Sequence, residues 1–199
     1  NPYLTLDPGY EAEVLRSFGI LVEKGLVYQS QKPVLWSTGA QTALAEAEVE
    51  YAPRTDPAIF VKFSLGAVAL PAELQDRLPS EAGFVIWTTT PWTLPANVAI
   101  ALDARAEYVV GDFGDHVLII ARDRVEAFAE ESGLALTKEY GTVRGEELRG
   151  LEVPHPFLPR TSRVITADFV TMDSGTGQVH IAPGHGKDDY VAGQQNGLP

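Results

Sequence analysis

The chain has 199 residues, with 15 Lys and Arg against 27 Asp and Glu, a formal net charge of −12 at pH 7 and no cysteine. These counts exclude a disulfide-stabilised scaffold and any site built from thiolate ligands. The hydrophobic fraction of 45% is typical of a globular protein with a substantial core. The longest apolar runs, 98–102 and 117–121, fall short of the roughly 20 residues that cross a bilayer, so we expect no transmembrane helix, no membrane partner and no signal peptide.

The acidic balance argues against extensive contacts with nucleic acid, because binding to phosphates depends on Lys and Arg. One stretch differs, since residues 138–163 carry five basic and four acidic side chains. Two interpretations of this stretch stay open. It is either a solvated hairpin region of mixed charge or the side of the molecule that tolerates a polyanion.

The N-terminal part of the chain predicts a long helix followed by short elements. Apolar residues recur at helical spacing after a turn at Asp7, which predicts an amphipathic helix over residues 11–25. Strands are expected over residues 32–37 and 59–65, with a short helix over 42–48 between them.

A region rich in short strands follows a predicted helical segment at 72–78. Its strands are separated by turns that contain Pro, Gly or Asp, and they are expected over residues 84–89, 98–102, 108–112 and 117–121. The pair Gly114-Asp115 predicts a tight hairpin between the last two of these strands. Two helices and three further strands complete the chain. The helices are expected over 122–131, ended by Gly133, and over 187–195, ended by Asn196-Gly197; the strands are expected near 143 and over 164–167 and 178–182.

Short strands at intervals of about ten residues favour one fold class over another. We expect an α+β fold that is mostly β, a closed or partly closed β-barrel with peripheral α-helices, rather than a doubly wound sheet. No internal repeat or low-complexity linker divides the sequence, so residues 1–199 are expected to form a single domain.

The sequence lacks the motifs of several common enzyme classes. It contains no G-x-S-x-G elbow, no G-x-x-x-x-G-K-[ST] phosphate loop and no H-E-x-x-H helix. One unusual segment is WTTTPWTLPAN at 87–97. Because Pro91 cannot donate to a sheet ladder, the strand is expected to end there or to lie at an edge, with the threonine hydroxyls at a rim. Threonine also favours strands in its own right, so the run has a purely structural interpretation as well.

A second unusual segment is GTGQVHIAPGHGKDDY at 175–190. A strand is expected to end at Pro183 and a helix to begin after Gly186, with two carboxylates in its first turn. The helix dipole alone favours acidic residues there, but a carboxylate at such a rim can also bind an ammonium group. A metal cluster is a rival interpretation, and its ligands would be His180, His185, Asp188 and Asp189. Their spacing fits no ligand pattern, so we expect no metal and no cofactor.

The two segments resemble the editing domain, or connective polypeptide 1, of isoleucyl-tRNA synthetase, a class I enzyme. The resemblance rests on KPVLW at 32–36, TALAEAEVEY at 42–51, the threonine-rich block at 87–97 and residues 175–190. The related valyl and leucyl enzymes usually have an Arg-Pro pair where this sequence has Thr90-Pro91-Trp92, and they lack the histidine that stands here at 180. The signatures of the synthetic site are missing, so the resemblance implies an editing domain excised from a larger synthetase.

The resemblance implies an aminoacyl-tRNA deacylase, which hydrolyses the ester of valine with the 3′-terminal adenosine of isoleucine tRNA. Valyl-adenylate is a further substrate if the parent enzyme also edits before transfer. As is known for isoleucyl-tRNA synthetases, one methylene is worth only about 1–3 kcal/mol, so a second site must admit valine and exclude isoleucine by size. The family pattern implies that Asp189 holds the α-ammonium group and that His180 limits the size of the pocket. Asp188 better suits a simple helix N-terminal acid.

The other roles concern the water and the adenosine. Hydrolysis of an aminoacyl ester needs an attacking water and stabilisation of the developing oxyanion, but no covalent nucleophile. Thr89 and Thr90, with Thr88 behind them, can supply hydrogen bonds to the water and to the adenosine. Asn97 matches a position near the pocket, and His185 either contacts the adenosine or fills the turn. A general-base role for His180 is less favoured, because no acidic residue nearby in sequence orients its ring.

The expected partners follow from the same resemblance. They are the 3′-terminal adenosine of valyl-tRNA, bound weakly by this fragment alone, and the remainder of the parent synthetase, in a cytoplasmic monomer. An alternative stays open: the isolated fragment is a non-catalytic module that binds aminoacyl-adenosine. The predicted catalytic residues are Thr89, Thr90, His180 and Asp189, and the predicted substrate-binding residues are Thr88, Asn97, His180, His185 and Asp189.

Overall fold

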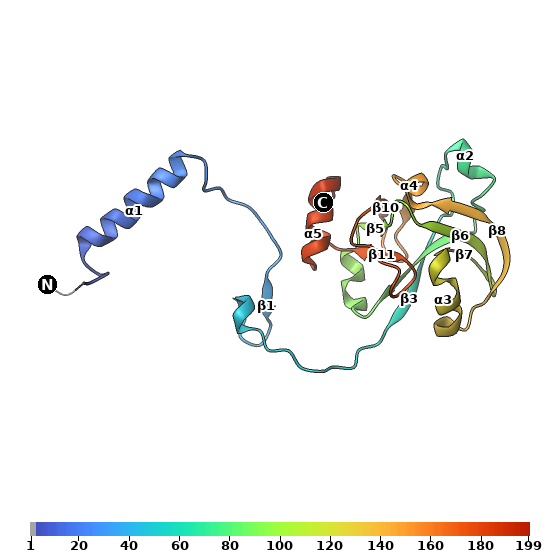
Figure 1. Ribbon diagram of the computed structural model, residues 1–199, viewed down its shortest axis with the longest axis horizontal. Coiled ribbons are helices and arrows are strands. Elements are labelled where there is room, and N and C mark those ends of the chain that lie inside the picture. The colour runs from blue at the N-terminus through green and yellow to red at the C-terminus, as the bar shows by residue number, and fades with distance from the viewer. Residues whose placement is uncertain (1–2) are drawn as a thin grey trace. The chain divides into compact units, whose positions relative to one another are not determined.

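The computed structural model describes residues 3–199 and contains two compact units, the first ending at Lys32 and the second running from Pro33 to Pro199 (Figure 1). The first unit contains helix α1 (Pro8–Glu23), in which no side chain is buried. The helix starts earlier than the predicted 11–25, because the side chain of Asp7 caps it by accepting a hydrogen bond from Gly9 N at 2.8 Å. The prediction that residues 1–199 act as one editing domain stays a prediction.

The second unit begins with a small antiparallel hairpin of β1 (Leu35–Ser37) and β2 (Thr42–Leu44), followed by one 3-10 turn, η1 (Glu46–Glu48). The helix predicted over 42–48 is therefore wrong in its first half. The chain reverses at Gln41, which has a φ of 53°, and the residues after it pair with β1 instead of coiling.

A five-stranded sheet forms one layer of the second unit, in the order β3-β4-β7-β6-β8. All neighbours are antiparallel except β4 and β7, which run parallel. The strands are β3 (Ile59–Ser64), β4 (Gly83–Thr88), β6 (Glu107–Phe113), β7 (His116–Ala121) and β8 (Leu136–Arg144). The predicted hairpin between β6 and β7 is confirmed, with Gly114 at a φ of 59° in its turn.

A four-stranded sheet lies next to it, in the order β11-β5-β10-β9. The central pair, β5 and β10, is parallel, while β11 and β9 add to it in antiparallel fashion. The strands are β5 (Ala99–Leu102), β9 (Glu152–Pro154), β10 (Thr161–Thr166) and β11 (Gln178–Ile181).

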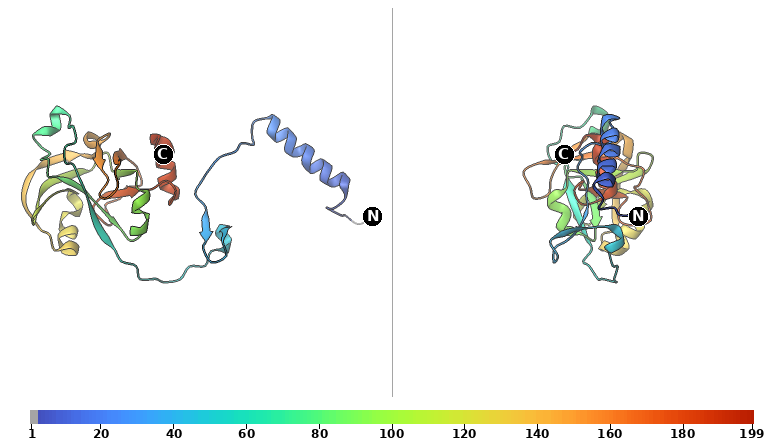
Figure 2. Two further views of the ribbon diagram at one scale, coloured as in Figure 1. Left: turned by 180° about the vertical axis from the view of Figure 1, so that it is seen from behind. Right: turned by 90° about the vertical axis from the view of Figure 1, so that its left-hand side faces the viewer.

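Short helices surround these sheets in the second unit (Figures 1 and 2). They are α2 (Ala72–Gln75), η2 (Pro91–Ala96), η3 (Arg122–Arg124), α3 (Val125–Ser132), α4 (Gly145–Leu148) and α5 (Lys187–Asn196). The predicted ends of α3 and α5 are confirmed, because Gly133 and Gly197 adopt left-handed φ values of 75° and 61° at the two C-termini.

The main core lies between the two larger sheets and draws side chains from both. Phe84 and Ile119 come from the five-stranded sheet, Ile100 and Leu102 come from the four-stranded sheet, and all four are completely buried. Each such side chain contributes about 1.5–3 kcal/mol when it leaves water, so this shared layer holds the two sheets together.

The prediction of a closed or partly closed β-barrel is wrong. Residues 3–199 form three sheets in a mixed α/β arrangement, and all three sheets are open. The two larger sheets meet where β11 contacts β4, but side chains bridge them there. The amide of Gln178 accepts from Val85 N at 3.0 Å and donates to Ile119 O, and the Thr176 hydroxyl donates to Val85 O. Side-chain hydrogen bonds, and not a backbone ladder, thus connect the residues of β11 and the turn before it to the interior strands β4 and β7.

Candidate functional site

The threonine segment lies where β4 ends and η2 begins at Pro91, as predicted. Thr88 is buried, whereas Thr89 and Thr90 are exposed. The Thr88 hydroxyl accepts from Thr90 N at 3.0 Å and lies 3.2 Å from the Thr90 hydroxyl, so it fixes the turn. The arrangement presents Thr89 and Thr90 to solvent at the end of a buried strand.

The ring of His180 joins the two unusual segments of the sequence. His180 lies on β11 opposite Ile100 of β5 and is only partly buried. Its Nδ1 is 2.8 Å from Asn97 Nδ2, and its Nε2 is 2.8 Å from Thr93 Oγ1. The Thr93 hydroxyl donates in turn to Thr90 O at 2.9 Å, which connects the ring to the threonine turn.

The direction of each hydrogen bond around His180 follows from one acceptor, the carbonyl of Ala99. Asn97 Nδ2 lies 2.8 Å from this carbonyl, which can only accept, so the amide nitrogen faces it. The second N–H of the Asn97 amide then points at His180 Nδ1, which must be an acceptor. The proton of a neutral ring therefore sits on Nε2 and is donated to Thr93 Oγ1.

The electrostatics agree with a neutral ring. Burial, together with the nearby charges of His185 and His155, lowers the pKa of His180 from 6.5 to about 4. At neutral pH the ring is uncharged, and both of its nitrogens are engaged by hydrogen bonds. No lone pair is free to take a proton from water, so this geometry favours His180 as a wall over His180 as a general base.

Asp189 lies in the first turn of α5 with its side chain partly buried. Its Oδ2 accepts from Ala182 N at 2.8 Å, two residues beyond His180. Burial raises the pKa of the Asp189 carboxyl and the charge of Asp188 adds to this, while the bond from Ala182 N opposes it. A carboxylate in this setting gains from a cationic partner. Asp188 is exposed, as a plain helix N-terminal acid would be.

The turn before α5 contains two glycines with different surroundings. At Gly184 no atom lies within 4 Å of where a Cβ would stand, whereas at Gly186 the Cγ of Asp189 lies 3.0 Å away. Gly186 thus makes room for the Asp189 side chain. His185 is exposed between the two glycines, with its backbone N donating to Ala182 O at 2.8 Å, and its role stays a prediction.

Sequence reasoning missed Thr93, Ser162 and His155. Thr93 stands three residues after Thr90, a spacing that returns to the same side of a 3-10 turn, so it could have been found. Ser162 and His155 lie more than fifty residues away in sequence from their partners, Asn97 and Leu94. The Ser162 hydroxyl donates to Asn97 Oδ1 at 2.6 Å, and His155 Nε2 lies 3.0 Å from Leu94 O.

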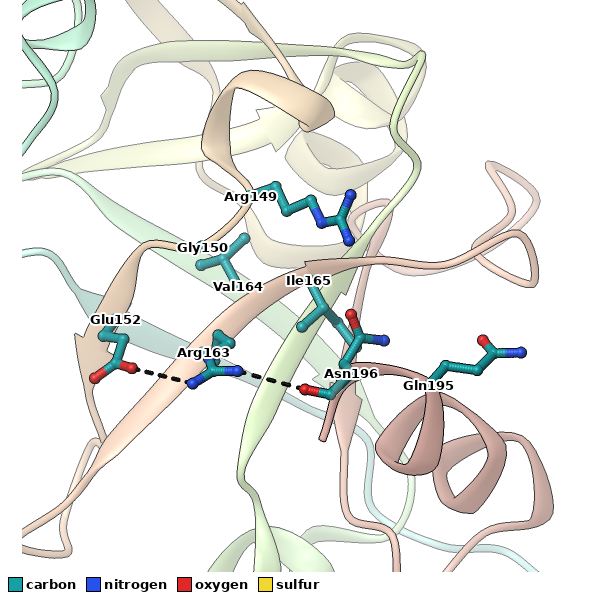
Figure 3. Close-up of a pocket in the computed structure, with 8 residues that line it drawn as sticks. All are labelled: Arg149, Gly150, Glu152, Arg163, Val164, Ile165, Gln195 and Asn196. Atoms are coloured by element: carbon teal, nitrogen blue, oxygen red, sulfur yellow. Dashed lines mark hydrogen bonds and ion pairs between the residues drawn. The ribbon is translucent and has the colours of Figure 1, made fainter. Parts of the chain in front are cut away.

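Three pockets lie elsewhere in the second unit and are lined by other residues. One of them, of about 420 Å³, contains Arg149 and Arg163 (Figure 3). Each guanidinium has a carboxylate partner, Glu146 for Arg149 and Glu152 for Arg163, both at 3.6 Å. These pairs fit the mixed-charge interpretation of residues 138–163. Within residues 3–199 no three acidic or histidine side chains gather closely enough to hold a metal ion.

The sequence profile of the family described as tRNA synthetases class I (I, L, M and V) matches residues 1–181. The chain belongs to this family. Among curated class I synthetases, the isoleucine–tRNA ligase of Thermotoga maritima is 48% identical over 203 residues, which cover 100% of this chain and 21% of that protein. The isoleucine–tRNA ligase of Caldanaerobacter subterraneus is 46% identical, again over 100% of this chain and 21% of the relative. The chain thus spans about a fifth of the length of these class I synthetases, and the predicted resemblance to isoleucyl-tRNA synthetase is confirmed.

Solved structures of class I synthetases share the fold. A crystal structure of GlLeuRS-CP1 superposes with a TM-score of 0.59 at 19% identity, covering 70% of this chain and 59% of that one. The editing domain of the P. falciparum cytosolic leucyl-tRNA synthetase gives a TM-score of 0.52 at 14% identity, covering 62% of this chain and 49% of that one.

No helix within residues 3–199 is long and apolar enough to cross a membrane.

Proposed function

We propose that this chain is the editing domain of an isoleucyl-tRNA synthetase and that it hydrolyses the ester of valine with the 3′-terminal adenosine of isoleucine tRNA, in the cytoplasm. Valyl-adenylate is a second substrate of the same site if the parent enzyme also edits before transfer. The observation that carries the proposal is the ring of His180, which bridges the threonine turn and the strand that leads to Asp189. The similarity to isoleucine–tRNA ligases over the whole chain supports the choice of amino acid.

Asp189 would bind the α-ammonium group of the substrate. Its Oδ2 is already turned toward the end of β11 by Ala182 N, so the carboxylate is oriented before the substrate arrives. Its raised pKa means that the ionised carboxylate is poorly solvated, and a bound ammonium group would relieve this cost.

His180 would form the wall that excludes isoleucine. Hydrogen bonds at both ring nitrogens hold the imidazole in one rotamer. The ring therefore cannot easily move aside to admit the additional methylene of isoleucine. Rigidity matters here because the methylene is worth only about 1–3 kcal/mol of discrimination.

The exposed hydroxyls of Thr89 and Thr90 would position the attacking water and the adenosine end. Water adds to the ester carbonyl carbon, and the tetrahedral intermediate collapses by breaking the bond to the ribose oxygen. That oxygen takes up a proton, and the products are free valine and uncharged tRNA. Hydrogen bonds from neutral hydroxyls stabilise the oxyanion of the intermediate without a covalent enzyme intermediate.

A second candidate function is a non-catalytic module that binds aminoacyl-adenosine. The observation that favours it is that this chain covers only 21% of the length of its relative. In this case, contacts from the rest of a monomeric synthetase would complete the catalytic site.

Valyl-tRNA deacylation by this chain tests both candidates. Release of valine above the buffer rate is expected, with loss of binding and hydrolysis in Asp189→Ala and retention in Asp188→Ala, the exposed neighbouring acid. Binding of a non-hydrolysable valyl-adenosine analogue without any release would support the module instead. Equal affinity of the analogue for the wild type and Asp189→Ala would refute the ammonium assignment.

A further inference from the structure

We propose that Ser162 is a positioning residue that sets the tautomer of His180 through the side chain of Asn97. The proposal rests on the proposed function for its consequence, the selection of valine over isoleucine, but the tautomer itself can be measured without substrate. The Ser162 hydroxyl donates to Asn97 Oδ1, and Asn97 in turn contacts the ring of His180, so Ser162 acts through Asn97.

The three side chains form a row across three adjacent strands. Ser162 lies on β10, Asn97 lies two residues before β5, and His180 lies on β11. These strands are neighbours in the order β11-β5-β10. Ser162 and Asn97 have no exposed surface. The row therefore runs from the interior of the sheet to the partly buried ring of His180.

The amide of Asn97 is fully engaged in this row. Its Oδ1 accepts from Ser162 Oγ at 2.6 Å, and its two N–H groups point at Ala99 O and His180 Nδ1, both at 2.8 Å. Among residues 3–199 no buried side-chain nitrogen or oxygen lacks a partner. Removing the Ser162 hydroxyl would leave Asn97 Oδ1 as a buried acceptor without a donor.

The orientation of the amide decides where the proton of His180 resides. In the observed orientation an N–H faces Nδ1, so the ring carries its proton on Nε2 and donates to Thr93. In the reversed orientation Oδ1 would face Nδ1, the proton would move there, and Nε2 would become an acceptor. Ala99 O opposes that reversal by repelling Oδ1. Ser162 opposes it because its hydroxyl donates to Oδ1 now, whereas after the reversal it could only accept from Nδ2 and its own proton would lose its acceptor.

Ala99 O gives the direction of the amide, and Ser162 adds to the preference for that direction. A buried carbonyl oxygen without a donor is unfavourable, so without Ser162 the observed orientation loses much of its advantage. The ring would then present a mixture of an N–H and a lone pair toward Thr93, and the Thr93 hydroxyl would no longer be held on Thr90 O. The wall of the proposed pocket would lose its single geometry.

The test is the ¹⁵N NMR spectrum of the His180 ring in wild type, Ser162→Ala and Thr161→Ala. In the wild type the shifts should be those of an unprotonated Nδ1 and a protonated Nε2. Ser162→Ala should increase the minor tautomer about tenfold, as expected for the loss of one buried hydrogen bond. Thr161→Ala removes an exposed hydroxyl from the same strand and should leave the ring unchanged.

Unchanged ring shifts in Ser162→Ala would overturn the proposal. If Ser162→Ala does not fold, Ser162→Cys keeps nearly the same volume with a much weaker donor and gives the same readout. Asn97→Asp, which offers Nδ1 an acceptor only, should place a proton on Nδ1, and an unprotonated Nδ1 in that variant would also contradict the scheme.

Hydrolysis assays then separate this proposal from the proposed function. If the chain deacylates valyl-tRNA, Ser162→Ala should lower the preference for valyl over isoleucyl ester, with the larger change in KM. A changed tautomer with an unchanged preference would overturn the link to selection. A changed tautomer in a chain that hydrolyses neither ester would refute the proposed function while supporting the role of Ser162 in positioning the ring.

Discussion

Replacing His180 by Gln should weaken the dependence of stability on pH. The pKa of His180 is about 4 in the folded chain and 6.5 in the reference state, so protons bind to the unfolded chain first as the pH falls. The contribution of the neutral ring is therefore fully present above pH 6.5 and is lost between pH 6.5 and 4. The Gln variant cannot titrate at this position and lacks that loss.

The magnitude follows from the same two values. At pH 5 the ring of the unfolded chain is mostly protonated and that of the folded chain is mostly neutral. At about 1.4 kcal/mol for each pH unit below 6.5, the wild type should lose about 2 kcal/mol more than His180→Gln between pH 7.5 and pH 5.

The assay is urea unfolding at the two pH values, followed by tryptophan fluorescence. The free energies of unfolding are compared as a difference of differences, which cancels the other titrating groups. His116→Gln, at an exposed position at the start of β7, serves as a matched control for the effect of a His→Gln substitution as such. Equal losses in wild type and His180→Gln would refute the burial argument.

Three further outcomes are expected. His180→Ala should open the proposed pocket and allow hydrolysis of isoleucyl-tRNA; full protection of that ester in a deacylation assay would remove His180 from the size limit. Gly177→Ala should cost about 2 kcal/mol or more in a thermal or urea melt, since Gly177 has a φ of 73° and a new Cβ would lie 2.4 Å from the Cβ of Ala121. Gly184→Ala, with open space around it, should be nearly neutral, and equal effects would contradict the packing argument. Treatment with EDTA should leave valyl-tRNA deacylation unchanged, whereas metal-dependent turnover would revive a metal site.

Local features of the fold could be predicted because they depend on neighbours in sequence. Pro91 ended a strand, Gly114 marked a hairpin, and Gly133 and Gly197 ended helices, each for reasons of backbone geometry. The short elements α4 and β9 were missed, since each spans only three or four residues and shows no periodicity.

Closure of the sheet could not be predicted in the same way. The spacing of strands is the same in a barrel and in two open sheets, so the pattern does not distinguish them. Gln178 and Thr176 connect the two sheets here, because their side chains bond to backbone groups of β4 and β7. Nothing in the sequence around these two residues marks that role.

The two segments of the candidate site could be predicted, but the hydrogen bonds that connect them could not. The threonine turn and the approach to Asp189 each carry an unusual local pattern, and the structure connects them through His180. Ser162 is an ordinary serine in an ordinary strand. Its contact with Asn97 depends on the parallel pairing of β10 with β5, which brings together residues 65 positions apart.

Residues of the loop between β9 and β10 donate hydrogen bonds to backbone carbonyls of the short helix η2. His155 is buried, its Nδ1 accepts from Leu158 N at 3.2 Å, and its Nε2 therefore donates to Leu94 O; Arg160 donates to Pro95 O. The conformation of η2 thus depends on residues outside the threonine-rich block at 87–97. A graft of residues 87–97 from another synthetase would arrive without its supports, so a functional exchange of the threonine block must carry residues 155–162 with it.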